Sequence, residues 1–576
     1  MNDTLQLQKK RFFLPGTAVL FSFFSVKWAL SVDNSFVFDD WSSLANARFS
    51  SWENLFRMFP QASYNDRSMG WLMYKLLNQL FGLNAQPYHM VYVAMHLVNV
   101  LLVYFVMKKL AERFSLNEEA RWIGFFTALF WGAYPVSLMA VSWISATFEM
   151  QCCNFILFSL LFYLKAEEKT EYSFFYAVLA FLAYWLSLRS KEMSLAFPVI
   201  LIVYESAKCV YEKKRWRLPW HLWAQLGFML IYAFMLFTGG QSSFSQTNPY
   251  HQNFNPLLML RNVLRYIVLY FDPFNPDMAY TSMKSTAIPG IVFFFVGVVV
   301  ALYLAIKKQH WYCLLSLVAA AGALVVVLPM ENMQHRLYLY IPSVFVSLFF
   351  AFLIMELHSW RQKKGFKEAA VLGCIVVFCF NYASGVTDLQ NYWLSVCERD
   401  QDQISQLNSI KKPVNYTQVY VVGAKKDYNI FYYGPGNSLR LLYDDATLHT
   451  ALVDEFPKSP ESPYLFLKYD NGTITEVKRD ETIPPQVKID QVYPNQIDAS
   501  EVREADGSVT LSLTGVYDWN DLEIRLNGVS IPFVQGENFC SFSIPSQYIQ
   551  KGETLEITLY SQQAYGESEA FIVPIV

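Results

Sequence analysis

The chain has 576 residues, of which 54% are hydrophobic and 16% charged. This balance excludes a disordered chain and an ordinary soluble globular protein, and it indicates a membrane core joined to a soluble part. The formal net charge of −3 includes no basic excess, so nucleic acid is not an expected partner.

Eleven apolar stretches follow one another through the first two thirds of the chain. A helix of about 20 residues is needed to cross the hydrocarbon core of a bilayer. We therefore predict an α-helical polytopic membrane protein with about 11 transmembrane helices. The first stretch lacks a small-residue cleavage site, so it is not a cleavable signal peptide. The predicted spans are residues 12–31, 88–107, 122–141, 147–164, 172–188, 194–210, 218–238, 288–306, 310–329, 338–356 and 366–385.

Basic clusters give the expected orientation. Lys9-Lys10-Arg11 precede the first span, which places the N-terminus in the cytoplasm by the positive-inside rule. The later clusters near residues 108–121, 165–169, 213–217, 307–308 and 361–367 agree. An odd number of spans then places the C-terminus outside the cytoplasm, and we expect a multi-pass protein of the bacterial inner membrane.

Two stretches mix apolar and charged residues too closely to be spans. Leu257 to Phe271 carries Arg261 and Arg265 one helical turn apart, which predicts an amphipathic helix on the outer face. Residues 49–81 predict helices that lie over the membrane surface and cover a site.

The composition changes after about residue 386. Apolar runs shorten, and turn pairs such as Asp506-Gly507 and Asn527-Gly528 separate alternating segments. Residues 522–531 predict a β-hairpin around Asn527-Gly528. The predicted domains are a catalytic membrane domain at 1–385, a mixed α/β segment at 386–483 and an Ig-like or IPT-like β-sandwich at 484–576, the last two extracytoplasmic.

An acidic pair, Asp39-Asp40, directly follows the first span. Carboxylates at a membrane boundary are costly to desolvate, so they are candidates for function, and one could serve as a general base while its neighbour orients it. The alternative is a solvated loop in which an aspartate caps the helix that begins near Trp41. The residues alone leave both open.

Several cationic side chains are expected at the same face, where they could stabilise an anionic leaving group such as a lipid phosphate. Each could instead simply extend its charged end to the interface, and Glu192 could neutralise Lys191 in a structural ion pair. The candidates for phosphate binding are Arg67, Lys191 and Arg336, and the wider pocket would include His89, Glu192, Arg261, Arg265, His335 and Tyr338.

Metal binding has little support in the sequence. His89 and His96 are seven residues apart, whereas a helical metal pair would be four apart, so packing or hydrogen bonding is the favoured role. No metal ligands are therefore assigned, although a divalent cation stays open as a cofactor. In the tail, Cys397 and Cys540 could form a disulfide, but their spacing gives it no support.

Taken in order, these residues resemble the GT-C superfamily of membrane glycosyltransferases, especially the transmembrane-and-TPR O-mannosyltransferases, with protein O-mannosyltransferases and aminoarabinose transferases more distant. The similarity covers roughly residues 12–385. The segments that carry it are Phe36-Val37-Phe38-Asp39-Asp40, Arg67-Ser68-Met69, Leu80-Phe81-Gly82-Leu83-Asn84, Pro87-Tyr88-His89, His96-Leu97-Val98-Asn99, Tyr134-Pro135-Val136, Val141-Ser142-Trp143-Ile144-Ser145, Ser190-Lys191-Glu192 and Arg336-Leu337-Tyr338-Leu339-Tyr340-Ile341-Pro342-Ser343.

The resemblance implies transfer of a sugar from a polyprenyl-phosphate-linked donor to an extracytoplasmic acceptor, usually with inversion at the sugar carbon. Asp39 would be the general base and Asp40 its partner, while Lys191, Arg336 and Arg67 would bind the donor phosphate. Because the tail does not resemble TPR repeats, the resemblance to the TPR relatives does not imply a protein acceptor. The acceptor could be a glycan, a lipid or a protein. Membrane lipid is the remaining expected partner.

Two other classes of function fit parts of the sequence. A transporter or flippase of a lipid-linked or anionic substrate would place its charges along a path across the membrane. A scaffold or receptor without catalytic activity would act through its external tail. Gathering of the charged residues at one face favours the enzyme.

Overall fold

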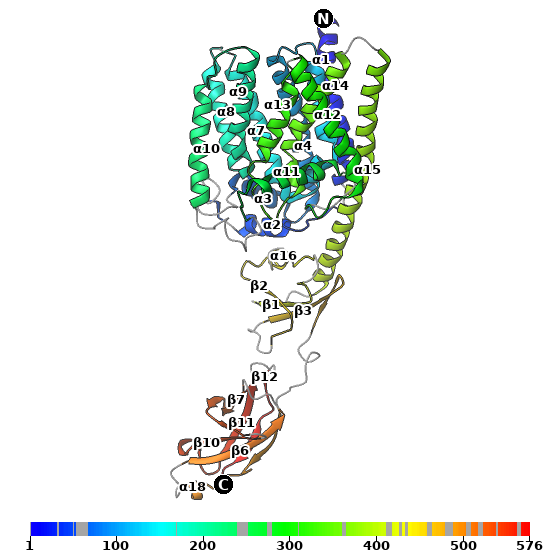
Figure 1. Ribbon diagram of the computed structural model, residues 1–576. Coiled ribbons are helices and arrows are strands. Elements are labelled where there is room, and N and C mark those ends of the chain that lie inside the picture. The colour runs from blue at the N-terminus through cyan, green and yellow to red at the C-terminus, as the bar shows by residue number, and fades with distance from the viewer. Residues whose placement is uncertain are drawn as a thin grey trace. The chain divides into compact units, whose positions relative to one another are not determined.

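The computed structural model describes the chain apart from residues 1, 31–33, 50, 53–66, 169, 239–250, 273–278, 309, 360–363, 411–417, 426–428, 432–435, 458–463, 478–487, 503–507, 517–521, 537–538 and 562–565. The chain forms two compact units, Met1–Gln401 and Asp402–Val576 (Figure 1).

The first unit is a bundle of helices. Its α-helices are α1 (Asn2–Val26), α2 (Asp40–Phe49), α3 (Ser68–Phe81), α4 (Ala85–Arg113), α5 (Ala120–Ala133), α6 (Pro135–Ser142), α7 (Thr147–Ala166), α8 (Ser173–Leu188), α9 (Phe197–Tyr211), α10 (Trp220–Thr238), α11 (Pro256–Phe271), α12 (Ile288–Lys308), α13 (Tyr312–Leu324), α14 (Pro342–Ser359) and α15 (Lys364–Ser409), the last of which continues into the second unit. Short 3-10 helices include η1 (Lys27–Leu30), η3 (Ile144–Ala146), η4 (Glu192–Ala196), η5 (Ser285–Ala287) and η6 (Arg336–Leu339).

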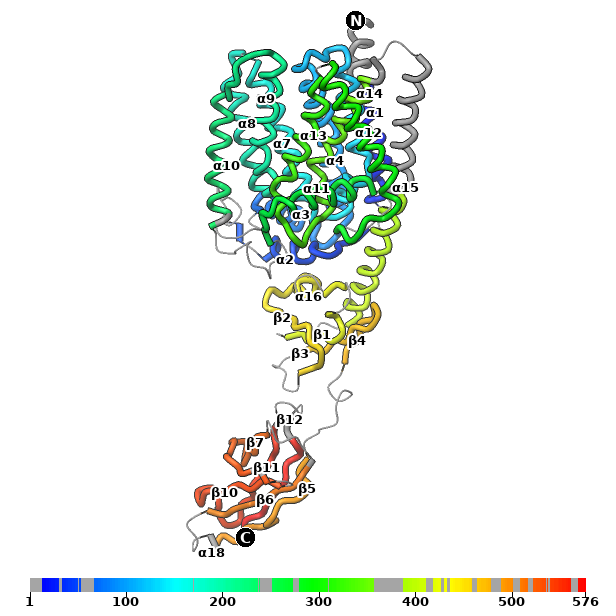
Figure 2. Tube along the Cα trace, viewed as in Figure 1, coloured from blue at the N-terminus to red at the C-terminus, as the bar shows by residue number. Residues whose placement is uncertain are grey.

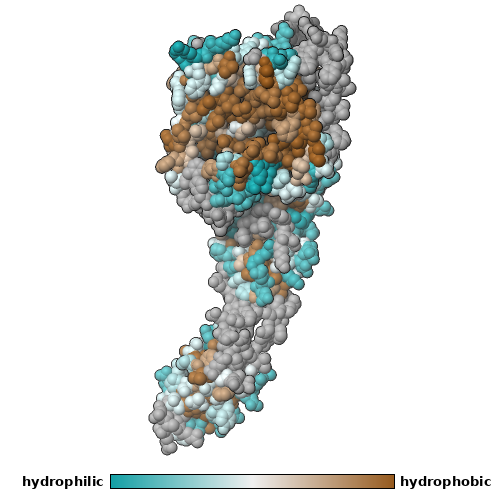
Figure 3. Space-filling model, viewed as in Figure 1, coloured by the Kyte–Doolittle hydropathy of each residue, from teal (hydrophilic) through white to brown (hydrophobic). Residues whose placement is uncertain are grey.

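Within the described residues, five helical segments are long and apolar enough to cross a membrane, and a sixth is the bent pair α5 and α6. Four shorter apolar helices coincide with further predicted spans, and the predicted span 366–385 falls within α15. An apolar band crosses the visible face of the bundle, with hydrophilic residues toward both of its ends (Figure 3). Apolar side chains such as Phe234 and Val299 are exposed, as expected for contact with lipid. The predicted polytopic helical fold is therefore confirmed, and the chain is an integral membrane protein.

One predicted span is not a straight helix. Residues 122–141 are divided between α5 and α6, which meet at an angle of 55°. Pro135 has no N–H to donate and disfavours helical geometry in the residue before it, and Tyr134 is indeed extended, with φ −78° and ψ 137°. The bend brings the end of α6 and the following Trp143–Ser145 turn to the cavity described below.

Helices α2 and α3 lie at the end of the bundle opposite the N-terminus (Figure 1). Gly70 allows α3 to approach α7, because a Cβ atom at this position would lie 2.0 Å from the Phe148 ring. Lys75 donates a hydrogen bond to the Ala47 carbonyl, 3.0 Å away, which ties α3 to α2. Residues 53–66 of the predicted covering segment lie outside the described part of the chain.

Helix α11 has the predicted amphipathic pattern. Leu257, Leu260 and Leu264 are exposed, whereas Asn262 and Tyr266 are buried. It is not among the helices whose length and composition would allow them to cross a membrane.

The second unit contains two β-structures (Figure 2). The first is a mixed sheet of order β2-β1-β3-β4, in which β1 is parallel to β2 and β3, and β4 is antiparallel to β3. This agrees with the predicted α/β character of the segment, although the predicted domain boundaries stay predictions. Its elements are β1 (Gln418–Val422), α16 (Asn437–Leu442), β2 (His449–Val453), β3 (Tyr464–Asp470) and β4 (Thr473–Glu476).

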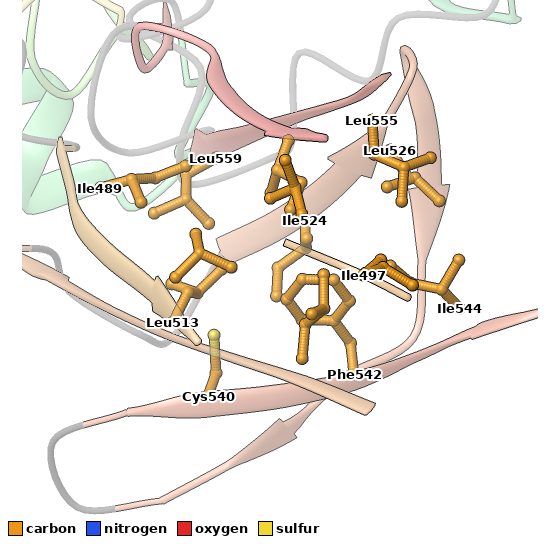
Figure 4. Packing of buried hydrophobic residues seen from close by; sticks show 14 of the residues in the cluster. Ile489, Ile497, Leu513, Ile524, Leu526, Cys540, Phe542, Ile544, Leu555 and Leu559 are labelled. Carbon is orange, nitrogen blue, oxygen red and sulfur yellow. The ribbon is translucent and has the colours of Figure 1, made fainter. Parts of the chain in front are cut away.

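The second β-structure consists of two sheets, of order β5-β6-β10-β9 and β12-β11-β7-β8, with β13 also paired to β11. Their inward side chains form one core that includes Ile524, Phe542 and Leu559 (Figure 4). The strands are β5 (Lys488–Tyr493), β6 (Ser508–Val516), β7 (Leu522–Leu526), β8 (Val529–Ile531), β9 (Val534–Gln535), β10 (Cys540–Pro545), β11 (Thr554–Ser561), β12 (Gly566–Glu567) and β13 (Phe571–Pro574), with the short α18 (Ala499–Val502) and η8 (Ser546–Tyr548).

The predicted hairpin is confirmed. Strands β7 and β8 pair antiparallel across Asn527 and Gly528, whose φ angles are 49° and 82°. Two successive positive φ angles are the requirement of the tight turn that suits the strand twist, and Asn-Gly meets it at low cost. The predicted Asp506-Gly507 turn lies outside the described residues.

Candidate active site

A polar cavity of about 350 Å³ lies beside α2 and α3. Five separate parts of the first unit contribute to its wall: the α2 region, the start of α3, the turn between α6 and α7, the turn after α8, and the segment before η6. The lining residues are Asp39, Ser42, Ser43, Asn46, Arg67, Trp71, Trp143, Ser145, Phe148, Glu149, Lys191, Met333, His335, Leu337 and Tyr338.

The two adjacent aspartates have different environments. Asp39 lines the cavity and is partly exposed, whereas Asp40 is fully buried behind it. The Asp40 carboxylate accepts hydrogen bonds from the Val37 N–H at 2.9 Å and from both the N–H and the hydroxyl of Ser145 at 2.7 Å. Burial raises the pKa of Asp40 to about 7, although these hydrogen bonds act in the opposite direction. Asp40 therefore anchors the loop rather than lining the cavity.

The loop that presents Asp39 is held from both sides. Phe38 has a φ of 51°, an uncommon conformation for a residue with a side chain. Its ring contacts Trp143 and Trp393, with centroids 6.0 Å and 5.9 Å away. On the same side, Ser35 donates to the Cys397 carbonyl at 3.3 Å. The part of α15 near Trp393 thus fixes the backbone just before Asp39.

Two opposing effects act on the pKa of Asp39. Burial raises the pKa of its carboxyl group above the usual value, and the Arg67 guanidinium lowers it. Because the effect of burial is the larger, the Asp39 carboxylate is a stronger proton acceptor than one in water. The arrangement suits a general base.

Arg67 is oriented by Glu192. Its Nε and Nη2 atoms donate to the carboxylate at 3.2 Å and 2.9 Å, a two-point contact that fixes the plane of the guanidinium. The same guanidinium lies over the Phe148 ring, 5.3 Å from its centroid. Glu192 is therefore the partner of Arg67. The Lys191–Glu192 ion pair considered from the sequence is not the arrangement found.

Lys191 pairs with Glu149 instead. The ammonium and carboxylate are in direct contact, and both side chains are buried. The Lys191 ammonium also lies 5.0 Å from the centroid of the Tyr338 ring. Burial and the neighbouring Arg67 hold the pKa of Lys191 well below its usual value, while Glu192 opposes the shift.

The sequence analysis missed Glu149. An ionisable residue near the start of a predicted span is a signal that could have identified it. The aromatic residues Trp71, Trp143 and Phe148 were also not assigned to the site, because aromatic side chains are common throughout the membrane domain. They line the cavity together with polar groups, a combination typical of a ligand pocket.

Two of the other predicted residues lie in the wall. His335 and Tyr338 both line the cavity, and His335 Nδ1 accepts the Leu337 N–H at 3.2 Å. Burial, with help from Lys191 and Arg336, lowers the pKa of His335 to about 3, so its imidazole is neutral at physiological pH. It can offer its remaining ring N–H to a ligand.

Arg336 lies elsewhere. It is buried and donates to the Asp272 carbonyl at 3.1 Å, and it is not among the residues that line this cavity. Its assignment to the donor phosphate stays a prediction that this geometry does not favour.

The remaining pocket candidates also lie outside the wall of the cavity. Arg265 donates to Gln334 at 2.7 Å and its guanidinium lies over the Tyr280 ring, while Arg261 is on the same helix. His89 is fully buried. His96 has the expected hydrogen-bonding role, with ring nitrogens 2.9 Å from the Tyr340 hydroxyl and 3.0 Å from the Gly132 carbonyl.

A second, mostly apolar cavity of about 210 Å³ adjoins the first. Lys191 and Tyr338 line both. The polar cavity therefore continues, at one lysine, into a space suited to a hydrocarbon chain. Its other lining residues are Glu192, Met193, Leu195, Leu236, Gln252, Phe254, Val325, Val326, Val327, Pro329 and Met330.

In the described part of the chain, no three His, Cys, Asp or Glu side chains converge on one point where a metal could bind. Cys397 and Cys540 are both free thiols in the structure, and a disulfide between them stays a prediction.

The chain has distant structural similarity to several solved structures. The Archaeoglobus fulgidus oligosaccharyltransferase tethered with an acceptor peptide is 13% identical, with a TM-score of 0.44, and the match covers 77% of this chain and 64% of that protein. AglB from the same organism, in complex with an inhibitory peptide and a dolichol-phosphate, is 12% identical, with a TM-score of 0.42 and coverages of 76% and 64%. The present chain thus spans less than two thirds of the length of these proteins.

ArnT from Cupriavidus metallidurans bound to undecaprenyl phosphate is also 12% identical, with a TM-score of 0.43, and here the match covers 93% of this chain and 98% of that protein. No protein-family model matches the sequence, and no curated protein matches it. An oligosaccharyltransferase and a protein bound to undecaprenyl phosphate are thus among the structures to which this chain is distantly similar.

Proposed function

We propose that the chain is a GT-C membrane glycosyltransferase that moves a sugar from a polyprenyl-phosphate-linked donor to an extracytoplasmic acceptor. The observation that carries the proposal is the meeting of two cavities at Lys191. A polar space with two carboxylates, two cations and aromatic rings adjoins an apolar space. A lipid-linked sugar has the same order of parts: a sugar, a phosphate and a hydrocarbon chain.

The proposed placement of the donor follows from the charges. Its phosphate lies between Lys191 and Arg67, its prenyl chain runs along Val325 and Val327 in the apolar cavity, and its sugar faces the aromatic wall and Asp39. Cations aimed at the departing phosphate stabilise the charge that develops on it. Because Lys191 and Arg67 already have carboxylate partners, the donor binds within an existing charge network and not to isolated cations.

In the proposed reaction, Asp39 takes a proton from an acceptor group while that group attacks the anomeric carbon of the sugar. The bond between this carbon and the phosphate oxygen breaks, and the electron pair leaves with the polyprenyl phosphate. Attack from the face opposite the phosphate gives inversion. Asp40 holds the loop in place and does not touch the substrate.

Asp39→Asn tests the proposal, because asparagine has the same shape but cannot accept a proton at this position. The purified full chain is incubated with a panel of radiolabelled polyprenyl-phosphate sugars and membrane extract as the acceptor source. We expect transfer to fall by about 10²–10⁴-fold, the usual contribution of a general base, with donor binding and thermal stability retained.

A matched control is Asp454→Asn, which changes an exposed carboxylate in the second unit. Retention of most activity in Asp39→Asn would remove this residue from the mechanism. Saturable movement of a lipid-linked substrate across proteoliposomes, without sugar transfer by the wild-type protein, would support a transporter instead.

A further inference from the structure

A third cavity, of about 600 Å³, lies at the other end of the helices that lead to Lys191. It is formed where α7 ends, α8 begins, α9 ends and α10 begins. Helix α8 has 16 residues, so this cavity is about 24 Å from the turn that carries Lys191. The lining residues are Ala166, Glu167, Ser173, Phe174, Ala177, Lys208, Pro219, Trp220 and His221.

Two polar atoms in this wall are buried without a hydrogen-bond partner among the described residues: Nε2 of His221 and Oγ of Ser173. His221 is only 7% exposed, and its ring is held against Tyr163, with centroids 4.7 Å apart. Buried polar groups normally have a partner, since leaving them unpaired costs free energy. These two atoms can both donate to a ligand oxygen, because a neutral imidazole carries one N–H and a hydroxyl can rotate.

The wall of the cavity also contains a carboxylate, that of Glu167. Glu167 accepts a hydrogen bond from the Tyr204 hydroxyl at 2.8 Å and is in direct contact with the Lys208 ammonium. Lys208 is shared with Glu205, whose carboxylate lies 3.6 Å away and accepts the Tyr163 hydroxyl at 2.7 Å. Two carboxylates therefore flank one ammonium, and that of Glu167 lines the cavity. An added cation would be stabilised at Glu167.

The rim of the cavity is aromatic and exposed. The rings of Trp220 and Phe174 are stacked, with centroids 5.9 Å apart, and both side chains are mostly exposed. Trp223, about one turn after Trp220, and Phe175, which directly follows Phe174, are exposed as well. Exposed tryptophan at a helix end is typical of the headgroup level of a bilayer. The cavity thus faces lipid headgroups, and the apolar surface of α8 and α10 continues from it toward the acyl chains.

We propose that this cavity binds the headgroup of a zwitterionic aminophospholipid, of which phosphatidylethanolamine is the simplest example. The ammonium of the headgroup pairs with Glu167, and its phosphate accepts hydrogen bonds from His221 and Ser173. A purely anionic headgroup brings no ammonium for Glu167, and Lys208, the cation that lines the cavity, is already paired with that carboxylate. This lipid site is separate from the proposed donor site and does not depend on it.

The test uses the purified full chain, stripped of lipid in detergent, and native mass spectrometry with added phosphatidylethanolamine or phosphatidylglycerol of the same acyl chains. We expect saturable binding of phosphatidylethanolamine, at least about fivefold tighter than that of phosphatidylglycerol. Ser173→Ala, His221→Ala and Glu167→Gln should each weaken it by about tenfold, the loss expected for one hydrogen bond to a charged group. Since Ser173 has no partner in the described structure, its replacement leaves the fold intact.

Glu356→Gln is the matched control. The side chain of Glu356 is as buried as that of Glu167 and also accepts a tyrosine hydroxyl, that of Tyr312, but it does not line this cavity. The proposal is overturned if the two lipids bind equally, if Ser173→Ala binds like the wild type, or if Glu356→Gln weakens binding as much as Glu167→Gln does. Equally tight binding of free phosphoethanolamine would assign the cavity to a soluble ligand and would overturn the lipid proposal too.

Discussion

Replacing Asp40 by asparagine removes a buried titratable group while keeping the shape of the side chain. In the native protein, burial raises the pKa of Asp40 to about 7 from the ordinary value of 3.8, whereas in the unfolded chain the ordinary value applies. The native state therefore keeps its proton over a pH range in which the unfolded state has lost it. Asp40 consequently contributes stability that is greatest below about pH 4 and is lost as the pH rises to about 7.

The magnitude follows from the size of this range. Each pH unit corresponds to about 1.4 kcal/mol, so the free energy of unfolding falls by about 4 kcal/mol over the whole range and by about 3 kcal/mol between pH 5 and pH 7. The amide in the Asp40→Asn variant does not titrate, so the free energy of unfolding of this variant lacks this fall with pH. It does lose the acceptor for the Val37 N–H, which costs about 1–3 kcal/mol at every pH.

We expect the stability of Asp40→Asn, measured relative to the wild type, to increase by about 3 kcal/mol between pH 5 and pH 8. The measurement is thermal unfolding followed by tryptophan fluorescence for the purified full chain at several pH values. Asp454→Asn, whose side chain is 84% exposed, is the control and should follow the wild type throughout. Parallel curves for Asp40→Asn and the wild type would refute the inference that the buried carboxyl group holds its proton.

Three other predictions concern positioning, charge pairing and the soluble region. Trp393→Ala should lower kcat by about tenfold or more with little change in donor KM, because it frees the Phe38 loop, and Trp393→Phe should restore most of kcat. Lys191→Gln should destabilise the protein by about 3–5 kcal/mol, since it leaves Glu149 buried and unpaired. The double variant with Lys191→Gln and Glu149→Gln should recover stability in thermal unfolding. It should not recover donor binding. Phe542→Ala should cost about 3–5 kcal/mol in the β-sandwich, seen as faster hydrogen exchange there and not in the helical bundle.

Local patterns in the sequence predicted most of the fold. Hydropathy over about 20 residues identified the spans because desolvation of the backbone requires each to be helical and apolar along its own length. The hairpin at Asn527-Gly528 was predictable for a similar reason, since two neighbouring residues set its turn. The continuation of α15 past residue 385 was not, because helix length beyond the membrane depends on packing against other parts of the chain. Trp393, which lies in this continuation, was therefore missed.

The candidate site was predicted as a set of residues but not as a set of pairs. Motif resemblance indicated Asp39, Arg67 and Lys191, and all three line one cavity. Their partners depend on contacts between distant segments: Arg67 meets Glu192, 125 residues away, and Lys191 meets Glu149 rather than its neighbour in sequence. Sequence proximity favoured a Lys191–Glu192 pair. The fold overrides it, because adjacent residues in a turn point in different directions.

The same geometry explains how two adjacent aspartates can have different roles. Successive residues at the start of a helix point about 100° apart, so only one of Asp39 and Asp40 can face the cavity. The carboxylate oxygens of Asp40 are occupied by Val37 and by Ser145, and Ser145 itself lines the cavity and accepts a hydrogen bond from Tyr74 at 3.1 Å. Removing Asp40 therefore also displaces part of the cavity wall, and loss of transfer in either variant would not by itself identify the base. Stability separates the two: Asp39→Asn should lose transfer at unchanged thermal stability, whereas Asp40→Asn should lose both at pH 5.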